Sequence, residues 1–177
     1  SHLLALVNDV LDMSRLESGK TELTKEVFNI KEIVDNATGS IDVMTKKHNV
    51  NNKGIHYDII HENLIGSPLH VQRVILNVIS NGIKYNKENG SLETWITEKP
   101  IGDNRSLFIF KIKDTGIGMS REYLDRIFEH TYQVSKARTP DADSGSGLGL
   151  AIVKTIITQH KGNIHCESRL LEGSVFY

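Results

Sequence analysis

Residues 67–86 read SPLHVQRVILNVISNGIKYN, and the rest of the chain is organised around them. The apolar residues of this stretch recur at three- and four-residue steps: Val71, Val74, Ile75, Val78, Ile79 and Ile83. This period predicts an amphipathic helix with one face in a core. Asn77 and Asn81 lie on one face of that helix, and Lys84 and Tyr85 follow within a turn. Asparagine is a poor helix former, so the pair indicates either a binding site or an internally bonded polar stripe.

Three further motifs follow in order. Residues 107–112 alternate in a way that predicts a strand, and Asp114 comes at its end, before the glycine turn of residues 115–119. Residues 145–153, GSGLGLAIV, place glycines at the start of a helix, whose bare N–H groups suit a phosphate. The third motif is Glu-Gly-Ser at 172–174.

In this order the four motifs resemble the ATP-binding domain shared by sensor histidine kinases, gyrase-type topoisomerases, heat-shock chaperones and mismatch-repair ATPases. Phe128-Glu129 and the amphipathic helix before the domain resemble the histidine kinase branch. The resemblance spans nearly the whole chain. It implies an α+β fold, an α/β sandwich of the Bergerat type: a mixed sheet with three main helices packed on one face, preceded by one amphipathic helix.

Length and composition set the limits of the interpretation. The 177 residues suffice for one domain with an appendage, and a net charge of −1 argues against nucleic acid as a partner. The single cysteine, Cys166, excludes an internal disulfide. No apolar run approaches the roughly 18 residues of a spanning helix, and no signal peptide opens the chain. We therefore expect no membrane contact by this segment, which we interpret as a cytoplasmic piece of a larger, membrane-bound sensor kinase.

Residues 1–20 carry a stripe close to heptad spacing, made of Leu3, Leu4, Val7, Val10, Leu11 and Ser14. The segment resembles the second helix of the dimerisation and phosphoacceptor hairpin of histidine kinases, whose first helix, with the phosphorylated histidine, is absent here. His2 is followed by Leu3 where that histidine has an acidic neighbour, and the other histidines show no metal-ligand spacing. Residues 21–177 are then the catalytic ATP-binding domain, with an ATP lid at about 129–146.

Periodicity and turn residues predict the remaining elements. We expect strands at 22–29, 55–60, 91–97, 106–114, 162–168 and 173–177, and helices at 31–47, 121–128 and 147–160. Ser67 and Ser120 are expected to cap the helices that they precede. Residues 49–54 are expected to form a turn-rich gap, and 100–104 a hairpin loop.

The resemblance implies ATP and Mg²⁺ as cofactors and gives each motif a role. Asp114 would accept a hydrogen bond from the adenine amine, with Ser174 adding a water-bridged contact. The residues lining the nucleotide would be Gly116, Ile117, Gly118, Met119, Lys84 and Tyr85. Asn81, assisted by Asn77, would hold the magnesium ion, which prefers oxygen ligands. Phosphate oxygens would bind the backbone amides of Gly145, Gly147, Leu148 and Gly149.

The lid departs from the pattern of many relatives. Thr131 takes the place of a second aromatic residue, which puts lid order in doubt, and Gln133 is typical of the hybrid kinase branch. Arg138, or else Lys136, would supply positive charge to the lid. The predicted catalytic residues are accordingly Lys84 and Arg138.

The leading hypothesis is a protein-histidine kinase catalytic domain that donates the ATP γ-phosphoryl group to a histidine of the hairpin, for relay to a response-regulator receiver domain. The parent protein is expected to be a homodimer that binds ATP and ADP. A non-kinase ATPase of the same superfamily would carry a glutamate in place of Asn77. A catalytically silent binding or dimerisation scaffold is the third possibility, and a nucleotide-binding test separates it from the other two.

Overall fold

The computed structural model describes residues 7, 10, 11, 14, 23–129 and 147–177. Its strands are β1 (Glu26–Asn29), β2 (Asn51–Asp58), β3 (Asn63–Gly66), β4 (Ser91–Gly102), β5 (Arg105–Asp114), β6 (Cys166–Arg169) and β7 (Gly173–Phe176). Its helices are α2 (Ile30–His48), α3 (Pro68–Lys84), α4 (Arg121–Leu124) and α5 (Gly149–Gln159).

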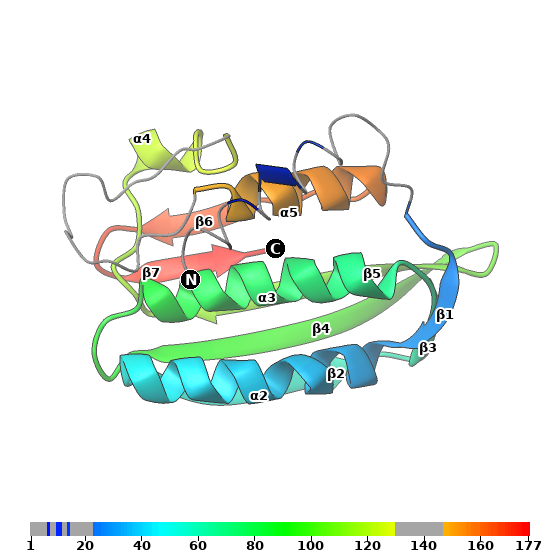
Figure 1. Cartoon of the computed structure of the whole chain (residues 1–177), viewed down its shortest axis with the longest axis horizontal. Helices are drawn as coiled ribbons and strands as arrows, with labels where there is room; N and C mark the ends of the chain where they lie inside the picture. Colours follow the sequence, from blue (N-terminus) through cyan, green and yellow to red (C-terminus); the bar gives the residue numbers. More distant parts are fainter. Residues whose placement is uncertain (1–6, 8–9, 12–13, 15–22, 130–146) are drawn as a thin grey trace.

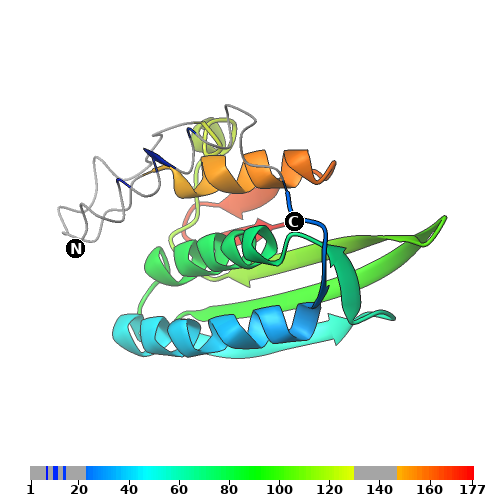
Figure 2. The same ribbon diagram turned by 45° about the vertical axis from the view of Figure 1, so that its right-hand side comes forward.

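Two sheets are present in the described residues. The larger has the order β2-β4-β5-β7-β6, and the smaller pairs β1 with β3. The β2–β4 pair is parallel and the other pairs of the large sheet are antiparallel, so that sheet is mixed. Helices α2, α3 and α5 lie together on one of its faces (Figures 1 and 2). This arrangement confirms the predicted α/β sandwich.

The central helix is α3, which packs between α2 and α5 (Figure 1). Four of the six residues of the predicted apolar stripe, Ile75, Val78, Ile79 and Ile83, are each at most 2% exposed. The other two, Val71 and Val74, are partly buried against the same core. Removing one such side chain from water contributes roughly 1.5–3 kcal/mol. The core is therefore built around the helix that carries Asn77 and Asn81.

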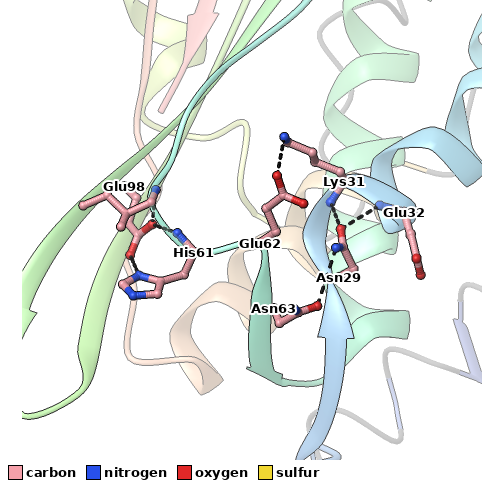
Figure 3. Close-up of polar contacts among 8 residues, drawn as sticks. Asn29, Lys31, Glu32, His61, Glu62, Asn63 and Glu98 are labelled. Atoms are coloured by element: carbon pink, nitrogen blue, oxygen red, sulfur yellow. Dashed lines mark hydrogen bonds and ion pairs between the residues drawn. The ribbon is translucent and has the colours of Figure 1, made fainter.

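Polar contacts fix the start of α2. The side-chain oxygen of Asn29 accepts hydrogen bonds from the backbone N–H groups of Lys31 and Glu32, which caps the helix (Figure 3). Lys31 Nζ lies 2.5 Å from Glu62 Oε1, in the segment between β2 and β3. Asn29 Nδ2 also donates, at 3.5 Å, to Asn63 Oδ1. The β2–β3 segment is thus joined to the first turn of α2.

The same segment is joined on its other side to β4. The carboxylate of Glu98, whose side chain is fully buried, accepts from the backbone N–H groups of Ile60 and His61 at 2.7 Å each (Figure 3). It also contacts His61 Nδ1 at 2.7 Å and accepts from Ser106 Oγ at 2.6 Å. Burial alone would raise the pKa of Glu98, but these hydrogen bonds outweigh burial and lower the pKa to about 2.

The opposite face of the large sheet carries a row of stacked side chains. His56 stacks on Trp95 with ring centres 5.6 Å apart, and Lys111 Nζ lies 4.8 Å from the Trp95 ring centre. Lys111 Nζ is 5.9 Å from the Tyr177 ring, which stacks on His165 at 4.7 Å. Cross-strand contacts of this kind stabilise a sheet face that none of the described helices covers.

The structure corrects several predicted boundaries in the first half of the chain. Residues 51–54 are not a gap, because β2 begins at Asn51; polar residues and a bulge between Asn52 and Ile55 conceal this strand in the sequence. The short strand β3 was not predicted. Ser67 does stand at the N-cap of α3, but its hydroxyl contacts His70 Nδ1 at 2.6 Å and accepts from Thr24 Oγ1.

Boundaries also differ further along the chain. The expected loop at 100–104 is a two-residue turn of Asp103 and Asn104, both with φ of 52°, and β4 extends to Gly102. The helix expected at 121–128 ends at Leu124. The chain after it forms turns closed by hydrogen bonds between residues three apart, such as Glu129 N–H to Arg126 O. Ser120 holds that helix through its backbone carbonyl rather than its hydroxyl.

The predicted division at residue 20 and most of the predicted lid lie outside the described residues. The four described positions before residue 23 are helical, and Val7, Val10 and Leu11 are 44–49% exposed. Across the described parts of the chain, no helix combines the length and apolar composition needed to cross a bilayer.

Candidate functional site

Asp114 ends β5 in the middle of the large sheet and is 7% exposed. Its Oδ1 accepts two backbone hydrogen bonds, from Gly116 N–H at 2.8 Å and from Ser174 N–H at 3.2 Å. Burial raises the pKa of Asp114 to about 6, although these two bonds act in the opposite direction. Both bonds go to Oδ1, and Oδ2 accepts no hydrogen bond from the residues that the structure describes.

Close backbone packing shapes the turn after Asp114. A Cβ at residue 116 would lie 2.3 Å from Tyr85 O, so only glycine fits there. Ile117 N–H donates to the same Tyr85 carbonyl at 3.0 Å. Gly173, with φ of 107°, likewise lets its strand pass close to Asp114 O. The glycine motifs therefore bring the end of α3 and the start of β7 against the Asp114 turn.

Ser174 is held by a neighbour that the sequence did not reveal. Ser168 Oγ accepts from Met119 N–H at 2.8 Å, donates to Gly173 O at 2.8 Å and lies 2.9 Å from Ser174 Oγ. Because the single Ser168 proton is used on Gly173, the Ser174 hydroxyl is the donor between the two serines. A Cβ at Gly118 would lie 1.9 Å from Arg169 O, so this predicted site residue packs against the β6 end.

The two asparagines of α3 have different surroundings. Asn77 Nδ2 donates to Arg73 O at 3.0 Å, in the preceding turn. A Cβ at Gly149 would lie 3.0 Å from Asn77 Oδ1, so this oxygen faces the first residue of α5. Asn81, one turn later, has a side chain that makes no hydrogen bond within the described part of the chain. The amide oxygens are thus available to a ligand, as oxygen ligation of Mg²⁺ requires.

Lys84 and Tyr85 close α3. Lys84 Nζ lies 5.3 Å from the centre of the Tyr85 ring, and burial raises the pKa of the Tyr85 hydroxyl. Tyr85 is the C-cap residue, and its carbonyl is the one that accepts from the Asp114 turn. A positive charge, an aromatic ring and the buried carboxylate therefore share this end of the helix.

Gly147 and Leu148 precede α5. Gly147 has φ of 72°, and Leu148, 6% exposed, packs in a small cluster with Ala151, Ile152 and Ile156. The first turn of α5 contains no acidic residue, so its N-terminal N–H groups suit an anion. Gly145 and Arg138, with Lys136 and most of the lid, lie outside the described residues.

Gly82 is a site residue that the sequence prediction missed. A Cβ there would lie 2.7 Å from Leu92 Cδ1 and 3.5 Å from Asp114 Cβ, so its small size lets Asp114 approach α3. A glycine inside a helix costs about 1 kcal/mol relative to alanine. That cost was the signal that could have identified it.

Comparisons with known proteins agree with this geometry. Residues 66–177 match the family described as histidine kinase-, DNA gyrase B-, and HSP90-like ATPase. The signal transduction histidine-protein kinase BarA of Escherichia coli is 30% identical over 182 residues, covering 100% of this chain and 19% of BarA. The autoinducer 2 sensor kinase/phosphatase LuxQ of Vibrio vulnificus is 32% identical, covering 99% of this chain and 20% of LuxQ.

A solved structure agrees as well. The crystal structure of full-length ShkA in complex with AMPPNP superposes with a TM-score of 0.80 at 26% identity, covering 99% of this chain and 35% of that one. The chain spans about a fifth of the length of BarA and of LuxQ. With the family match covering more than half of its length, the chain belongs to the histidine kinase-, DNA gyrase B- and HSP90-like ATPase family.

Proposed function

We propose that the chain is the ATP-binding catalytic domain of a sensor protein-histidine kinase, and that the Asp114 carboxylate is its adenine acceptor. The observation that carries the proposal is the state of this carboxylate, which is 7% exposed and held through Oδ1 by two backbone N–H groups. Such a group can accept a hydrogen bond from an exocyclic amine through Oδ2. Ser174, whose backbone binds the same carboxylate, would add a water-bridged contact to the base.

The phosphates would lie between α3 and the start of α5. Lys84 would provide a point charge, and the amides of Gly147, Leu148 and Gly149, with Gly145, would bind phosphate oxygens. The oxygens of Asn81 and Asn77 fit a hard cation, and Mg²⁺ held there would neutralise phosphate charge. Phosphoryl transfer depends mostly on positioning and charge stabilisation, so these residues suffice to present the donor. Arg138 would add charge from the lid.

The acceptor would be a histidine on a helical hairpin of the parent protein, with a response-regulator receiver domain as the next acceptor. Residues 1–20 would be the second hairpin helix, in a homodimeric, membrane-bound parent with this domain on the cytoplasmic side. Asn77 argues against the alternative of a non-kinase ATPase, because an amide bonded to Arg73 O cannot act as a general base for water.

Transfer of the γ-phosphoryl group tests the proposal. The parent kinase is incubated with [γ-³²P]ATP and Mg²⁺, and the label is tested for acid lability and alkali stability, as a phosphohistidine requires. The expected result is such a label on the hairpin, lost in Asp114→Asn and retained in the exposed control Asp103→Asn. Rapid release of inorganic phosphate without a labelled hairpin would support the ATPase alternative and overturn the kinase proposal.

A further inference from the structure

Asn86 follows the C-cap of α3, and its side-chain amide uses its full hydrogen-bonding capacity. Nδ2 donates to Gly82 O at 2.8 Å and to Ser91 O at 3.1 Å. Oδ1 accepts from Lys87 N–H at 3.1 Å and from Thr115 Oγ1 at 3.5 Å. An asparagine amide offers two donors and two lone pairs, so all four are used. The amide thereby connects the end of α3, the following turn, the start of β4 and the Asp114 turn.

Two of these partners are direct neighbours of Asp114. Gly82 is the residue of α3 against which the Asp114 side chain packs. Thr115 follows Asp114 in the chain, donates through its backbone N–H to Ser91 O at 3.1 Å and accepts from Ser91 N–H at 2.8 Å. The Asn86 amide therefore holds Asp114 through the helix beside it and through the residue after it.

The helix end makes this amide necessary. The backbone N–H of Asn86 bonds to Ile83 O at 3.2 Å, so it does not bond to Gly82 O in the helical pattern. The side chain supplies that bond and satisfies a carbonyl that the helix end would leave open. The turn is fitted around the amide, because a Cβ at Gly90 would lie 2.0 Å from Asn86 Oδ1.

We propose that Asn86 is a positioning residue for nucleotide binding. It sets the placement of the adenine acceptor Asp114 relative to α3, which carries Asn81 and Lys84 for the phosphates. The inference rests on the proposed function and extends it to a side chain that acts only through its neighbours. Asp114 must contact the base while α3 contacts the phosphates of the same nucleotide. A shift of Asp114 relative to α3 therefore weakens binding even when every contacting residue is present.

The test compares Asn86→Asp with Asn89→Asp. The first variant keeps the shape and the acceptor oxygen but removes both donors, and it places carboxylate oxygens against the carbonyls of Gly82 and Ser91. The second makes the same chemical change in the same turn, where the Asn89 oxygen accepts from Asn49 Nδ2 at 3.0 Å and an aspartate still can. ADP binding is measured by calorimetry at a temperature where circular dichroism shows both variants to be folded. The Kd of Asn86→Asp should be at least tenfold higher than that of wild type, and the Kd of Asn89→Asp should be within twofold of it.

A second measurement separates positioning from a loss of stability. The Gly116 N–H donates to Asp114 Oδ1, so its NMR signal reports the titration of that carboxylate without nucleotide. A moved turn changes the burial and the hydrogen bonds of the carboxylate, and the titration midpoint of folded Asn86→Ala, which removes the amide without adding a charge near Asp114, should shift by at least about half a pH unit. A variant that is only less stable keeps the wild-type midpoint while it is folded.

Each outcome decides the proposal. Wild-type affinity in folded Asn86→Asp would overturn it. If wild type fails to bind ADP, the proposed function fails, and the Gly116 titration alone then decides whether Asn86 positions Asp114. If Asn86→Asp does not fold, Thr115→Val and Thr115→Ser replace it. The valine, which lacks the hydroxyl, should raise the Kd, and the serine, which keeps it, should restore binding; equal affinities for the two would contradict the proposal.

Discussion

Replacing Asp114 by asparagine should stabilise the nucleotide-free protein. The carboxylate is 7% exposed, and its pKa is raised from 3.8 to about 6, so keeping it ionised in the folded state costs free energy. A shift of about two units corresponds to about 3 kcal/mol at neutral pH. An asparagine oxygen can still accept from the Gly116 and Ser174 N–H groups. The charge is removed while the geometry is kept.

The stabilisation of the protein by Asp114→Asn should grow as the pH rises. Because the folded-state pKa of Asp114 is raised, the unfolded chain loses this proton first, and the contribution of Asp114 to the stability of wild type falls as the pH rises from 3.8 through about 6. The advantage of Asp114→Asn should be about 3 kcal/mol at pH 7.5, and about 1 kcal/mol at pH 4.5. For a domain of this size, 3 kcal/mol corresponds to about 6–12 °C in Tm.

Thermal unfolding without nucleotide at the two pH values measures the effect. Asp103→Asn is the matched control, because its side chain is 89% exposed and the same change there should leave Tm nearly unchanged. A lower Tm for Asp114→Asn at pH 7.5, or a difference that is the same at both pH values, would mean that the ionised Asp114 carboxylate does not destabilise the folded protein. A protein that gains stability when it loses this carboxylate keeps it for binding.

Three further predictions follow from the same geometry. Nucleotide affinity should fall as the pH drops below about 6, because protonation of Asp114 removes the acceptor; calorimetry at pH 7.5 and 5.5 measures this, and a constant Kd would count against an ionised acceptor. Gly116→Ala should weaken nucleotide binding at least tenfold, since its Cβ would lie 2.3 Å from Tyr85 O and 2.9 Å from Asp114 Oδ1; an unchanged Kd would show that the turn can move freely. Glu98→Gln should lower Tm by several degrees at pH 7, and the difference should shrink as the pH falls toward about 2, because wild type then also loses its ionised Glu98 carboxylate. A Tm equal to that of wild type at pH 7 would mean that the hydrogen bonds of Glu98 do not hold the β2–β3 segment.

The helical period of residues 67–86 was sufficient to predict the central helix and its buried face. Ile75, Val78, Ile79 and Ile83 are buried as the pattern required, because a helix packed on a sheet must turn one continuous stripe inward. The resemblance supplied the architecture, which the mixed sheet with three helices on one face confirms. Strand β2 was predicted only in part because it is an edge strand with polar residues and a bulge.

The site could be predicted as a set of motifs but not as a set of contacts. Asp114, Gly116 and Ser174 come together as their motifs implied, and Asn77 faces Gly149. No spacing in the sequence revealed that Ser168 would hold Ser174, or that Asn86 would link α3 to β4 and β5. Ser168 and Ser174 are six residues apart, and Asn86 bonds to Gly82 and Ser91 four and five residues away, but which side chains meet depends on how each turn is closed. The bonds of Ser168 to Met119 and of Asn86 to Thr115 join segments that only the tertiary fold brings together.

The most direct test of the account is a calorimetric titration of the protein with ADP and with a non-hydrolysable ATP analogue, with and without Mg²⁺, for wild type and Asp114→Asn. Wild type should bind each nucleotide saturably at one site. Binding should be weakened about thirty- to seven-hundred-fold in the variant, as expected for about 2–4 kcal/mol lost when a charged hydrogen-bond acceptor becomes a donor. Absence of binding by wild type at millimolar nucleotide, or equal affinity of wild type and Asp114→Asn, would contradict the proposal that Asp114 is the adenine acceptor of an ATP-binding site.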